Sequence, residues 1–405
     1  MRPFFCFRQL VPRMCSVIRK YRSRITRVII YSLLTGLLGI TIHIYVVYPL
    51  YVTKIPYFMK AVGAGFDIEC EGEGVSQLKN IIRYVGLPFF ALDNRIIYLS
   101  KTGHPAQCWT TVGGNGETGS TFPLASMTKV LTAFVTLNLI QRNESLTLDT
   151  KLLDFFPEVD RQSIEDSRLL EVDLENLLSH SSGFGGPFGS DDMVERGVQT
   201  WCPYRPYKLT SITLAGKPGE NYVYSNVAYC LLGEIIAKES GLGYVNYVEK
   251  EYLKNYDSLG FLTKNFNVEK PKYDYSNEHL FGPDYINWLD LNALAPAAGL
   301  TGNPLDFAKM IHSLFGEHPE ILSIPQIIGC GSGKIQNCYS ATLKIHNLEA
   351  EQRIGIQQGY LPGASSLLAI SSRGEVLVWT SAGAPLEHKY RSILEKRVVA
   401  FLKNP

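Results

Sequence analysis

Residues 121–140 read Thr121-Phe-Pro-Leu-Ala-Ser126-Met-Thr-Lys129-Val-Leu-Thr-Ala-Phe-Val-Thr-Leu-Asn-Leu-Ile140, and this is the most informative stretch of the 405-residue chain. Its apolar pattern predicts a helix that begins at Ser126. Residues three apart share one helix face, so the Lys129 amine would lie over the Ser126 hydroxyl. A serine needs an adjacent base to act as a nucleophile, and a desolvated lysine can lose its proton near neutral pH. The helix N-terminus adds free N–H groups that stabilise negative charge. The stretch therefore predicts a nucleophile that carries its own base.

A serine and a lysine at this spacing also arise by chance in a chain of this length, because both residues are common. Ser76-Gln-Leu-Lys79 is a second copy, which we interpret as a solvated helix face. The surrounding sequence has to distinguish the two copies.

Four further segments follow Ser126 in a fixed order. They are Ser145-Leu-Thr-Leu-Asp-Thr-Lys-Leu-Leu-Asp-Phe-Phe-Pro157, Leu174-Glu-Asn-Leu-Leu-Ser-His180-Ser-Ser-Gly183, Pro218-Gly-Glu-Asn-Tyr-Val-Tyr224-Ser-Asn226 and Ala295-Pro-Ala-Ala-Gly299. With the Ser126 stretch, they resemble the serine β-lactamase and penicillin-binding-protein-like hydrolases, specifically the class C branch. The resemblance runs from about Val85 to Leu402. It implies that the chain hydrolyses an amide or ester bond without a metal or cofactor.

The resemblance also implies roles for single residues. Tyr224 would relay the proton between Ser126 and the leaving group, and Asn226 would bind a substrate carbonyl and hold Lys129. The pattern Tyr-x-Asn occurs four times, but only Tyr224-Ser-Asn226 follows Pro-Gly and opens an apolar helix. His180 would be a structural loop residue, with a Ser-His-Asp arrangement as the alternative.

The third motif of that family departs from its usual form. The matching run is Ile356-Gln357-Gln358-Gly359-Tyr360, in which Gln357 stands where the family carries a lysine or histidine. Gly359 lets the backbone approach a substrate closely. By resemblance, the N–H groups of Tyr360 and Ser126 would form an oxyanion hole. Without the cation at 357, we expect poor turnover of β-lactams and of peptides that end in a carboxylate.

The first fifty residues predict a membrane anchor. Eight basic residues precede position 28, and residues 28–48 carry no formal charge, enough for about 31 Å of helix. We expect a basic cytoplasmic tail at 1–27, a transmembrane anchor at 28–50, a juxtamembrane linker at 51–84 and the hydrolase domain at 85–405. The catalytic domain would then lie on the periplasmic side of the inner membrane. A cleaved signal peptide is the competing interpretation.

Charge and cysteine content limit the partners. After position 66 the chain has 29 basic and 38 acidic residues, so it lacks the basic surface that nucleic acid binding requires. No zinc-ligand spacing is present, and we expect no metal site. Six cysteines follow the expected anchor, which suits an oxidising compartment. Cys330 and Cys338 are the favoured disulfide pair, and Cys230 is expected to be a free core thiol.

The element pattern predicts an α/β fold, an α+β sandwich. Strands near 86–92, 94–101, 340–348, 364–370 and 375–382 would form one antiparallel sheet from both ends of the chain. A helical subdomain would lie between them, and a helix over 386–402 would close the chain. The sequence thus predicts a membrane-anchored serine hydrolase that acts on a small peptide, amide or ester through an acyl-enzyme on Ser126. The alternatives are a D-alanyl-D-alanine carboxypeptidase or β-lactamase acting on cell-wall peptides, and a non-catalytic peptidoglycan- or acyl-ligand-binding protein.

Overall fold

The computed structural model describes residues 30–40, 59, 62–63, 67–86, 89, 93–110, 121–185, 199–262, 289–324, 339–348, 352–361, 364–383 and 388–405. The chain divides into two compact units, Met1–Pro56 and Tyr57–Pro405. Residues 30–40 of the first unit are helical. Within the described ranges, no helix combines the length and apolarity that a membrane span needs. Most of the expected anchor at 28–50 lies outside those ranges.

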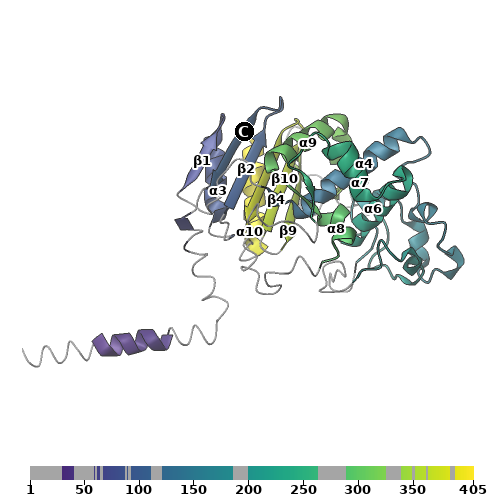
Figure 1. The fold of residues 1–405 in the computed structure, drawn as a ribbon, viewed down its shortest axis with the longest axis horizontal. Helices are drawn as coiled ribbons and strands as arrows, with labels where there is room; N and C mark the ends of the chain where they lie inside the picture. Colours follow the sequence, from purple (N-terminus) through teal and green to yellow (C-terminus); the bar gives the residue numbers. More distant parts are fainter. Residues whose placement is uncertain are drawn as a thin grey trace, which may run out of the picture. The chain divides into compact units, whose positions relative to one another are not determined.

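The second unit is built on an eight-stranded antiparallel sheet, in the order β1-β3-β2-β11-β10-β9-β8-β7 (Figure 1). The bounds are β1 Ile68–Glu71, β2 Asp93–Leu99, β3 Pro105–Thr110, β7 Tyr339–Ser340, β8 Leu343–Asn347, β9 Arg353–Leu361, β10 Ala364–Ser371 and β11 Val376–Ala382. The pairing of β2 with β11 joins the two ends of the chain, as the sequence predicts.

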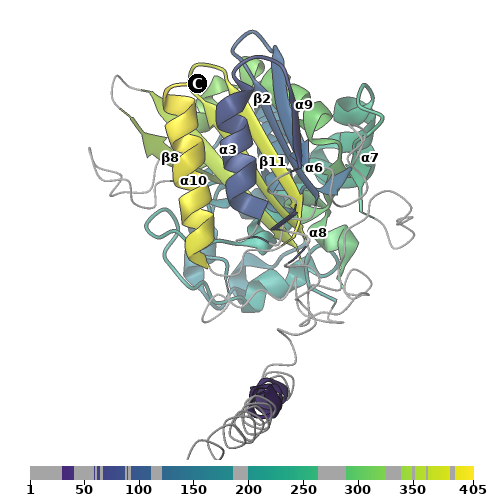
Figure 2. The ribbon, with the colours of Figure 1, turned by 90° about the vertical axis from the view of Figure 1, so that its left-hand side faces the viewer.

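Both faces of this sheet are covered, because successive side chains of a strand point to opposite faces. Ile96 of β2 belongs to one apolar core and Ile97 to the other. The first core lies under α3 (Val75–Gly86) and α10 (His388–Lys403), which run side by side across the sheet (Figure 2). The other face carries the helical region, whose α9 packs against β2 and β11. The result is the predicted α+β sandwich.

The helical region lies between the N-terminal and C-terminal strands in sequence. Its helices are α4 Thr128–Arg142, α5 Leu174–Leu178, α6 Asn226–Ser240, α7 Tyr244–Val248, α8 Leu291–Ala298 and α9 Pro304–Glu317. Its 3-10 turns are η1 Ala125–Met127, η2 Leu152–Phe155, η3 Arg161–Ser163, η4 Ser167–Glu171, η7 Pro206–Ser211 and η11 Pro319–Leu322, and η8 Glu249–Leu253 is a π-turn. A small sheet of β4 Phe122–Pro123, β6 Leu300–Gly302 and β5 Gly260–Phe261 joins the region to Ser126.

The folded domain begins earlier than the expected residue 85. β1 and α3 fall inside the stretch expected to be a linker at 51–84, yet β1 pairs with β3 and α3 packs on the sheet. The buried positions Leu78, Ile81, Ile82 and Val85 recur at helical spacing, although the preceding residues, Glu69-Cys-Glu-Gly-Glu73, are rich in acidic side chains. The strand expected at 94–101 is β2, but no strand was expected at β3.

Two disulfides connect described residues. Cys70 bonds to Cys108 across the β1–β3 pair, and Cys202 bonds to Cys230 of α6. The expectation of a free thiol at Cys230 was therefore wrong: the side chain is buried in an apolar helix face, but its partner comes from a loop that the sequence pattern did not place beside it. The expected pair Cys330–Cys338 lies outside the described residues.

Candidate active site

Ser126 lies on the η1 turn between β4 and α4, so the helix starts two residues later than predicted. Ala125 has φ +48°, a left-handed conformation that a residue with a side chain rarely adopts. Two side-chain hydrogen bonds hold the turn: Thr128 Oγ1 donates to the Ala125 carbonyl at 2.6 Å, and Ser366 Oγ donates to the Leu124 carbonyl at 2.8 Å. Such strain persists where surrounding structure enforces it, often at active sites.

Lys129 is fully buried one helical turn from the nucleophile. Its Nζ lies 3.2 Å from Ser126 Oγ, as the spacing predicts. The same Nζ donates to Asn226 Oδ1 at 2.6 Å and to the Ala297 carbonyl at 2.8 Å. Three oxygen atoms therefore surround Nζ and hold the side chain in one position. The Ala295-Pro-Ala-Ala-Gly299 segment thus contributes a backbone acceptor to the site.

Tyr224 and Asn226 enter the site from the start of α6. The Tyr224 hydroxyl donates to Ser126 Oγ at 2.7 Å, and its side chain is 41% exposed. Between them, Ser225 caps the helix by accepting from the Ala228 N–H at 3.0 Å. This cap fixes the start of α6, from which Tyr224 reaches Ser126 and Asn226 reaches Lys129. The structure therefore brings together the four residues that the sequence singled out as catalytic.

His180 packs behind Tyr224, with the two ring centroids 4.5 Å apart. The imidazole is fully buried, and burial holds the pKa of His180 well below its usual value, with the positive charge of Lys129 lowering it further. Its Nδ1 accepts from the Ser225 N–H at 3.2 Å, and its Nε2 lies 3.2 Å from Thr342 Oγ1. Ser126 Oγ receives no bond from it. The Ser-His-Asp alternative therefore has no geometric support.

The third motif lies on β9, beside the η1 turn. A Cβ built on Gly359 would come within 2.8 Å of the Leu124 carbonyl oxygen and 2.9 Å of the Ser126 nitrogen. The backbone of β9 therefore touches the nucleophile turn, as the oxyanion-hole interpretation requires. Gln357 is buried, and its amide bonds to protein groups: Oε1 accepts from Thr342 Oγ1 at 3.2 Å, and Nε2 donates to the Gln358 carbonyl at 3.1 Å.

The sequence reasoning missed a cation beside Tyr360. The Arg391 guanidinium of α10 lies 4.9 Å from the centre of the Tyr360 ring. Burial lowers the pKa of Arg391, while its interactions with Tyr360 and Tyr224 raise it. No carboxylate forms an ion pair with Arg391 among the described residues. No sequence signal marks this arginine, because its place depends on how α10 docks.

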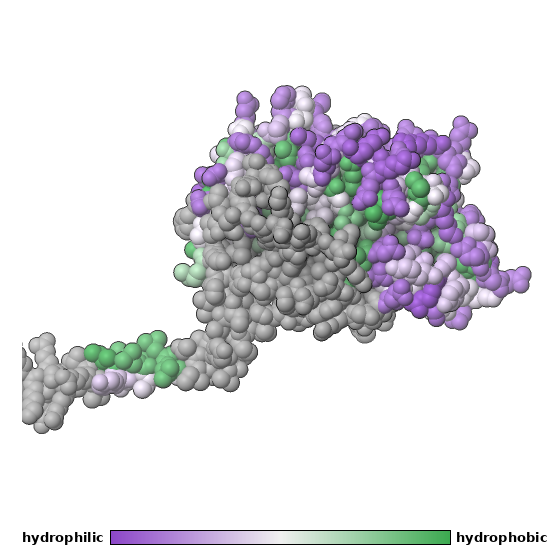
Figure 3. All heavy atoms as spheres, in the orientation of Figure 1, coloured by the Kyte–Doolittle hydropathy of each residue, from purple (hydrophilic) through white to green (hydrophobic). Residues whose placement is uncertain are grey.

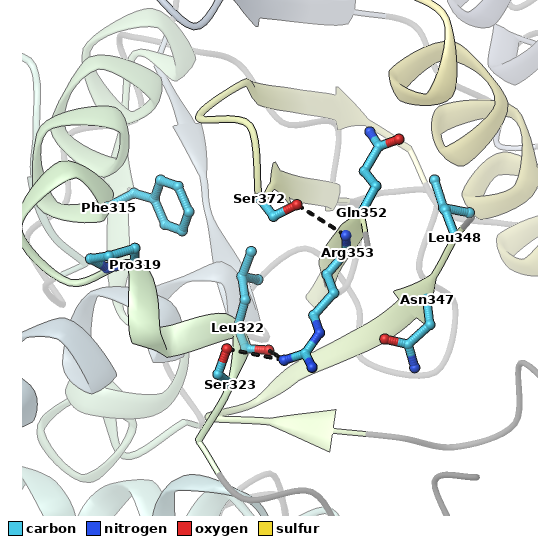
Figure 4. A pocket seen from close by; sticks show the side chains of 9 residues that line it. All are labelled: Phe315, Pro319, Leu322, Ser323, Asn347, Leu348, Gln352, Arg353 and Ser372. Atoms are coloured by element: carbon cyan, nitrogen blue, oxygen red, sulfur yellow. Dashed lines mark hydrogen bonds between the residues drawn. The ribbon is translucent and has the colours of Figure 1, made fainter. Parts of the chain in front are cut away.

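Other candidates lie away from Ser126. Ser76 is exposed on α3, and no group of metal-ligating side chains gathers within the described ranges. A cavity of about 470 Å³ lies where β9 begins, at the end of the strand away from Gly359. Figure 4 shows the side chains that line it. There the Arg353 guanidinium donates to the Leu322 carbonyl at 3.3 Å and to Ser323 Oγ at 3.0 Å, which ties β9 to η11. None of the predicted site residues lines this cavity.

Known proteins share this sequence pattern and this fold. The chain matches the Beta-lactamase family over residues 103–327. A Dichelobacter nodosus protein named for fimbrial assembly, FimD of serogroup D, is 25% identical over 351 residues, which cover 84% of this chain and 88% of that protein. An Escherichia coli (strain K12) protein named as a D-alanyl-D-alanine carboxypeptidase is 26% identical over 220 residues, 50% of this chain and 49% of that protein. The D-amino acid amidase of Ochrobactrum anthropi SV3 superposes with a TM-score of 0.60 at 17% identity, covering 78% of this chain and 96% of that one. At such identity the likeness shows a common fold.

Proposed function

This chain belongs to the beta-lactamase family, and we propose that it is a serine hydrolase that cleaves an amide or ester bond through an acyl-enzyme on Ser126. The observation that carries the proposal is the pair of contacts at one atom. Ser126 Oγ lies within hydrogen-bond distance of both Lys129 Nζ and the Tyr224 hydroxyl. A serine placed between two groups that can exchange its proton has the geometry of an activated nucleophile.

The reaction would proceed in two steps. Ser126 Oγ attacks the substrate carbonyl carbon and gives its proton to Lys129, which acts in its neutral amine form, and Lys129 passes that proton through the Tyr224 hydroxyl to the departing amine or alcohol. The carbonyl oxygen, negatively charged at that moment, accepts hydrogen bonds from the Ser126 and Tyr360 N–H groups. Water then attacks the acyl-enzyme, its proton returns to Ser126 Oγ, and the acid product leaves. Asn226 keeps Lys129 in place throughout.

Fluorophosphonate labelling tests this proposal directly. Ser126→Ala should abolish covalent labelling, because the attacking oxygen is gone. Ser76→Ala is the matched control, since it removes the serine of the second Ser-x-x-Lys copy on the exposed face of α3. Labelling that persists in the Ser126 variant would overturn the mechanism.

For the substrate, we favour esters and amides that lack a free carboxylate at the scissile end. Gln357 is neutral and buried, so it offers no charge to such a carboxylate. The amidase named above shares the fold, and its name describes an enzyme that acts on amides.

Arg391 favours a second candidate, a carboxypeptidase. Two lysines lie shortly before β9 in the sequence: Lys344 is bonded to Glu395 at 2.6 Å, and Lys334 lies outside the described residues. Arg391 lies against Tyr360 without a carboxylate partner among the described residues. A charged hydrogen bond is worth about 1.5–3 kcal/mol.

A pair of substrates separates the two candidates. For a carboxypeptidase, Arg391→Met should lower kcat/KM about ten- to a hundredfold on a peptide with a free terminal carboxylate. The same variant should leave turnover of the amide-capped peptide unchanged. Lys396→Met, on an exposed position of α10, is the control. Equal losses on both peptides would remove the carboxypeptidase candidate.

We also propose that the enzyme is anchored in the inner membrane with its catalytic domain on the periplasmic side. Residues 30–40 carry exposed apolar side chains, including Leu33, Leu34 and Leu37, visible as the green segment in Figure 3. The uncharged run continues on both sides of this helix in the sequence. The two disulfides of the second unit are in keeping with an oxidising compartment.

A further inference from the structure

Gln357 lies in a line of hydrogen bonds that crosses the site behind Tyr224. The Ser225 N–H has only a proton to give, so His180 Nδ1 must accept it. The imidazole is neutral, and its one proton is therefore on Nε2, which donates to Thr342 Oγ1. The Thr342 hydroxyl in turn donates to Gln357 Oε1. Every link thus has a defined direction, from α6 toward β9.

The backbone at two links of this line is strained. His180 has φ +56° and Thr342 has φ +70°, and a left-handed conformation is an outlier for a β-branched residue such as threonine. Both side chains are fully buried. The His180 carbonyl also accepts from the Val223 N–H at 2.7 Å, which holds the segment before Tyr224 from the other side. Strain of this kind persists where surrounding contacts enforce it.

We propose that Gln357 is a positioning residue, which ends a hydrogen-bond chain from His180 through Thr342 and so sets the spacing between Tyr224 and β9. The inference rests on the proposed function, because that spacing matters only if Tyr224 and β9 act on one substrate. It accounts for the departure at this position. A lysine has no acceptor for the Thr342 proton, whereas a glutamine amide supplies one. The Tyr229 hydroxyl, whose own proton goes to the Leu178 carbonyl at 2.9 Å, also hydrogen-bonds to Thr342 and is a second acceptor beside Gln357, but Tyr229 lies on α6 and does not extend the chain to β9.

The test compares fluorophosphonate labelling rates of matched variants. Thr342→Val keeps the side-chain shape and removes the hydroxyl, whereas Thr342→Ser keeps the hydroxyl. Gln357→Met removes the acceptor, and Gln358→Met alters the neighbouring side chain, which bonds to Glu395 at 3.0 Å on the other face of β9. We expect Thr342→Val and Gln357→Met each to slow labelling about ten- to a hundredfold, as misplaced catalytic groups do.

The conservative variants and the double variant distinguish a connected hydrogen-bond chain from separate local effects. Thr342→Ser and Gln358→Met should label at the wild-type rate, and the Thr342→Val/Gln357→Met double variant should be no slower than either single variant. Wild-type rates in both disruptive variants, or losses that multiply in the double variant, would overturn the proposal.

Nitrogen NMR of the wild-type imidazole tests the chain without activity or substitution. We expect the His180 proton on Nε2, and a proton on Nδ1 would overturn the proposal. If wild-type protein does not react with the fluorophosphonate, the proposed function fails, while the Nε2 signal still tests the direction of the link from His180 to Thr342. A variant that fails to fold leaves this measurement intact.

Discussion

At the scale of single residues, the surroundings of Gly359 explain why the third motif has a glycine there, although it has no cation at position 357. The position where a Cβ would stand lies 2.9 Å from the Ser126 nitrogen and 2.8 Å from the Leu124 carbonyl oxygen. These two neighbours are backbone atoms, which cannot rotate away as the third neighbour, the Ser366 hydroxyl, can. Any side chain here would push β9 away from the nucleophile turn. Glycine is therefore required by the close approach of two backbones.

We predict that Gly359→Ala lowers kcat/KM on a small ester about a hundred- to a thousandfold, as loss of an oxyanion donor does. The methyl group would displace the Ser126 N–H from the substrate oxygen. Gly316→Ala is the control: this glycine is exposed in α9 with no atom within 4 Å of the added Cβ, so activity should be unchanged. Full activity in the Gly359 variant would show that β9 does not approach the substrate.

The site residues differ in how well the sequence alone predicts their contacts, and the difference follows from how far apart in sequence the partners lie. Ser126 and Lys129 share a turn, so their contact follows from spacing alone. The contact of Tyr224 with Ser126 spans 98 residues, but an apolar helix start and the family pattern indicate it. The link between His180 and Thr342 spans 162 residues and involves two strained turns. No pattern along the chain encodes such a pairing, because it depends on how the sheet and helical region dock.

At the scale of elements, Asp166 fixes the turns that lie before the His180 loop. Its carboxylate caps η4, accepts two hydrogen bonds from the Arg168 guanidinium at 2.9 and 2.6 Å, and accepts the Leu214 N–H at 2.9 Å. The next residue along, Ala215, donates its N–H to the Gly183 carbonyl at 2.8 Å. One carboxylate therefore joins η4 to the loop that supports the histidine segment.

We predict that this contact makes stability depend on pH between about 4 and 2. The Arg168 hydrogen bonds lower the pKa of Asp166 to about 2, below its unfolded value of about 3.9. The folded state therefore binds this proton less readily, so the stabilisation is complete above pH 4 and is lost as the pH falls through 2. Thermal unfolding of Asp166→Asn should show a lower Tm than wild type at pH 5.

The difference in Tm between the two proteins should shrink toward pH 2, because the wild-type carboxyl is then protonated as well. Glu144→Gln, on an exposed position after α4, should follow the wild-type curve. A Tm difference that stays constant from pH 5 to pH 2 would contradict the assignment.

Elements with strong periodicity were predicted well, and those with short or ambiguous signals were not. The closing helix expected over 386–402 is α10, and the strands expected near 364–370 and 375–382 are β10 and β11. β1 has only four residues, Ile68-Glu-Cys-Glu71, so its alternation of apolar and acidic side chains is too short to indicate a strand. It becomes a strand because β3 offers it a partner and a disulfide joins the two.

At the scale of the whole molecule, each of the two compact units carries a feature that bears on where the protein is located in the cell. The first unit carries eight basic residues and then an uncharged run, and the second carries two disulfides. A basic block before an apolar span favours a cytoplasmic N-terminus. Disulfides form and persist outside the reducing cytosol. Both features therefore suit one topology, in which the chain crosses a membrane once and its hydrolase domain folds outside the cytoplasm.

We predict that a reporter active only outside the cytoplasm is active when fused after Pro405, and that extraction of the full chain requires detergent. Substituting the eight basic residues of the tail with serine should weaken this orientation, because the charge bias sets it.

In wild-type cells, Cys202 and Cys230 should resist a thiol reagent until a reductant is added, whereas the reoriented protein should react at once. A bond of this kind, closing a loop of 28 residues, contributes about 4 kcal/mol, so the reoriented domain should also unfold at a lower temperature. A cytoplasmic reporter signal together with thiols free before reduction would contradict the topology while leaving the chemistry of Ser126 open to its own test.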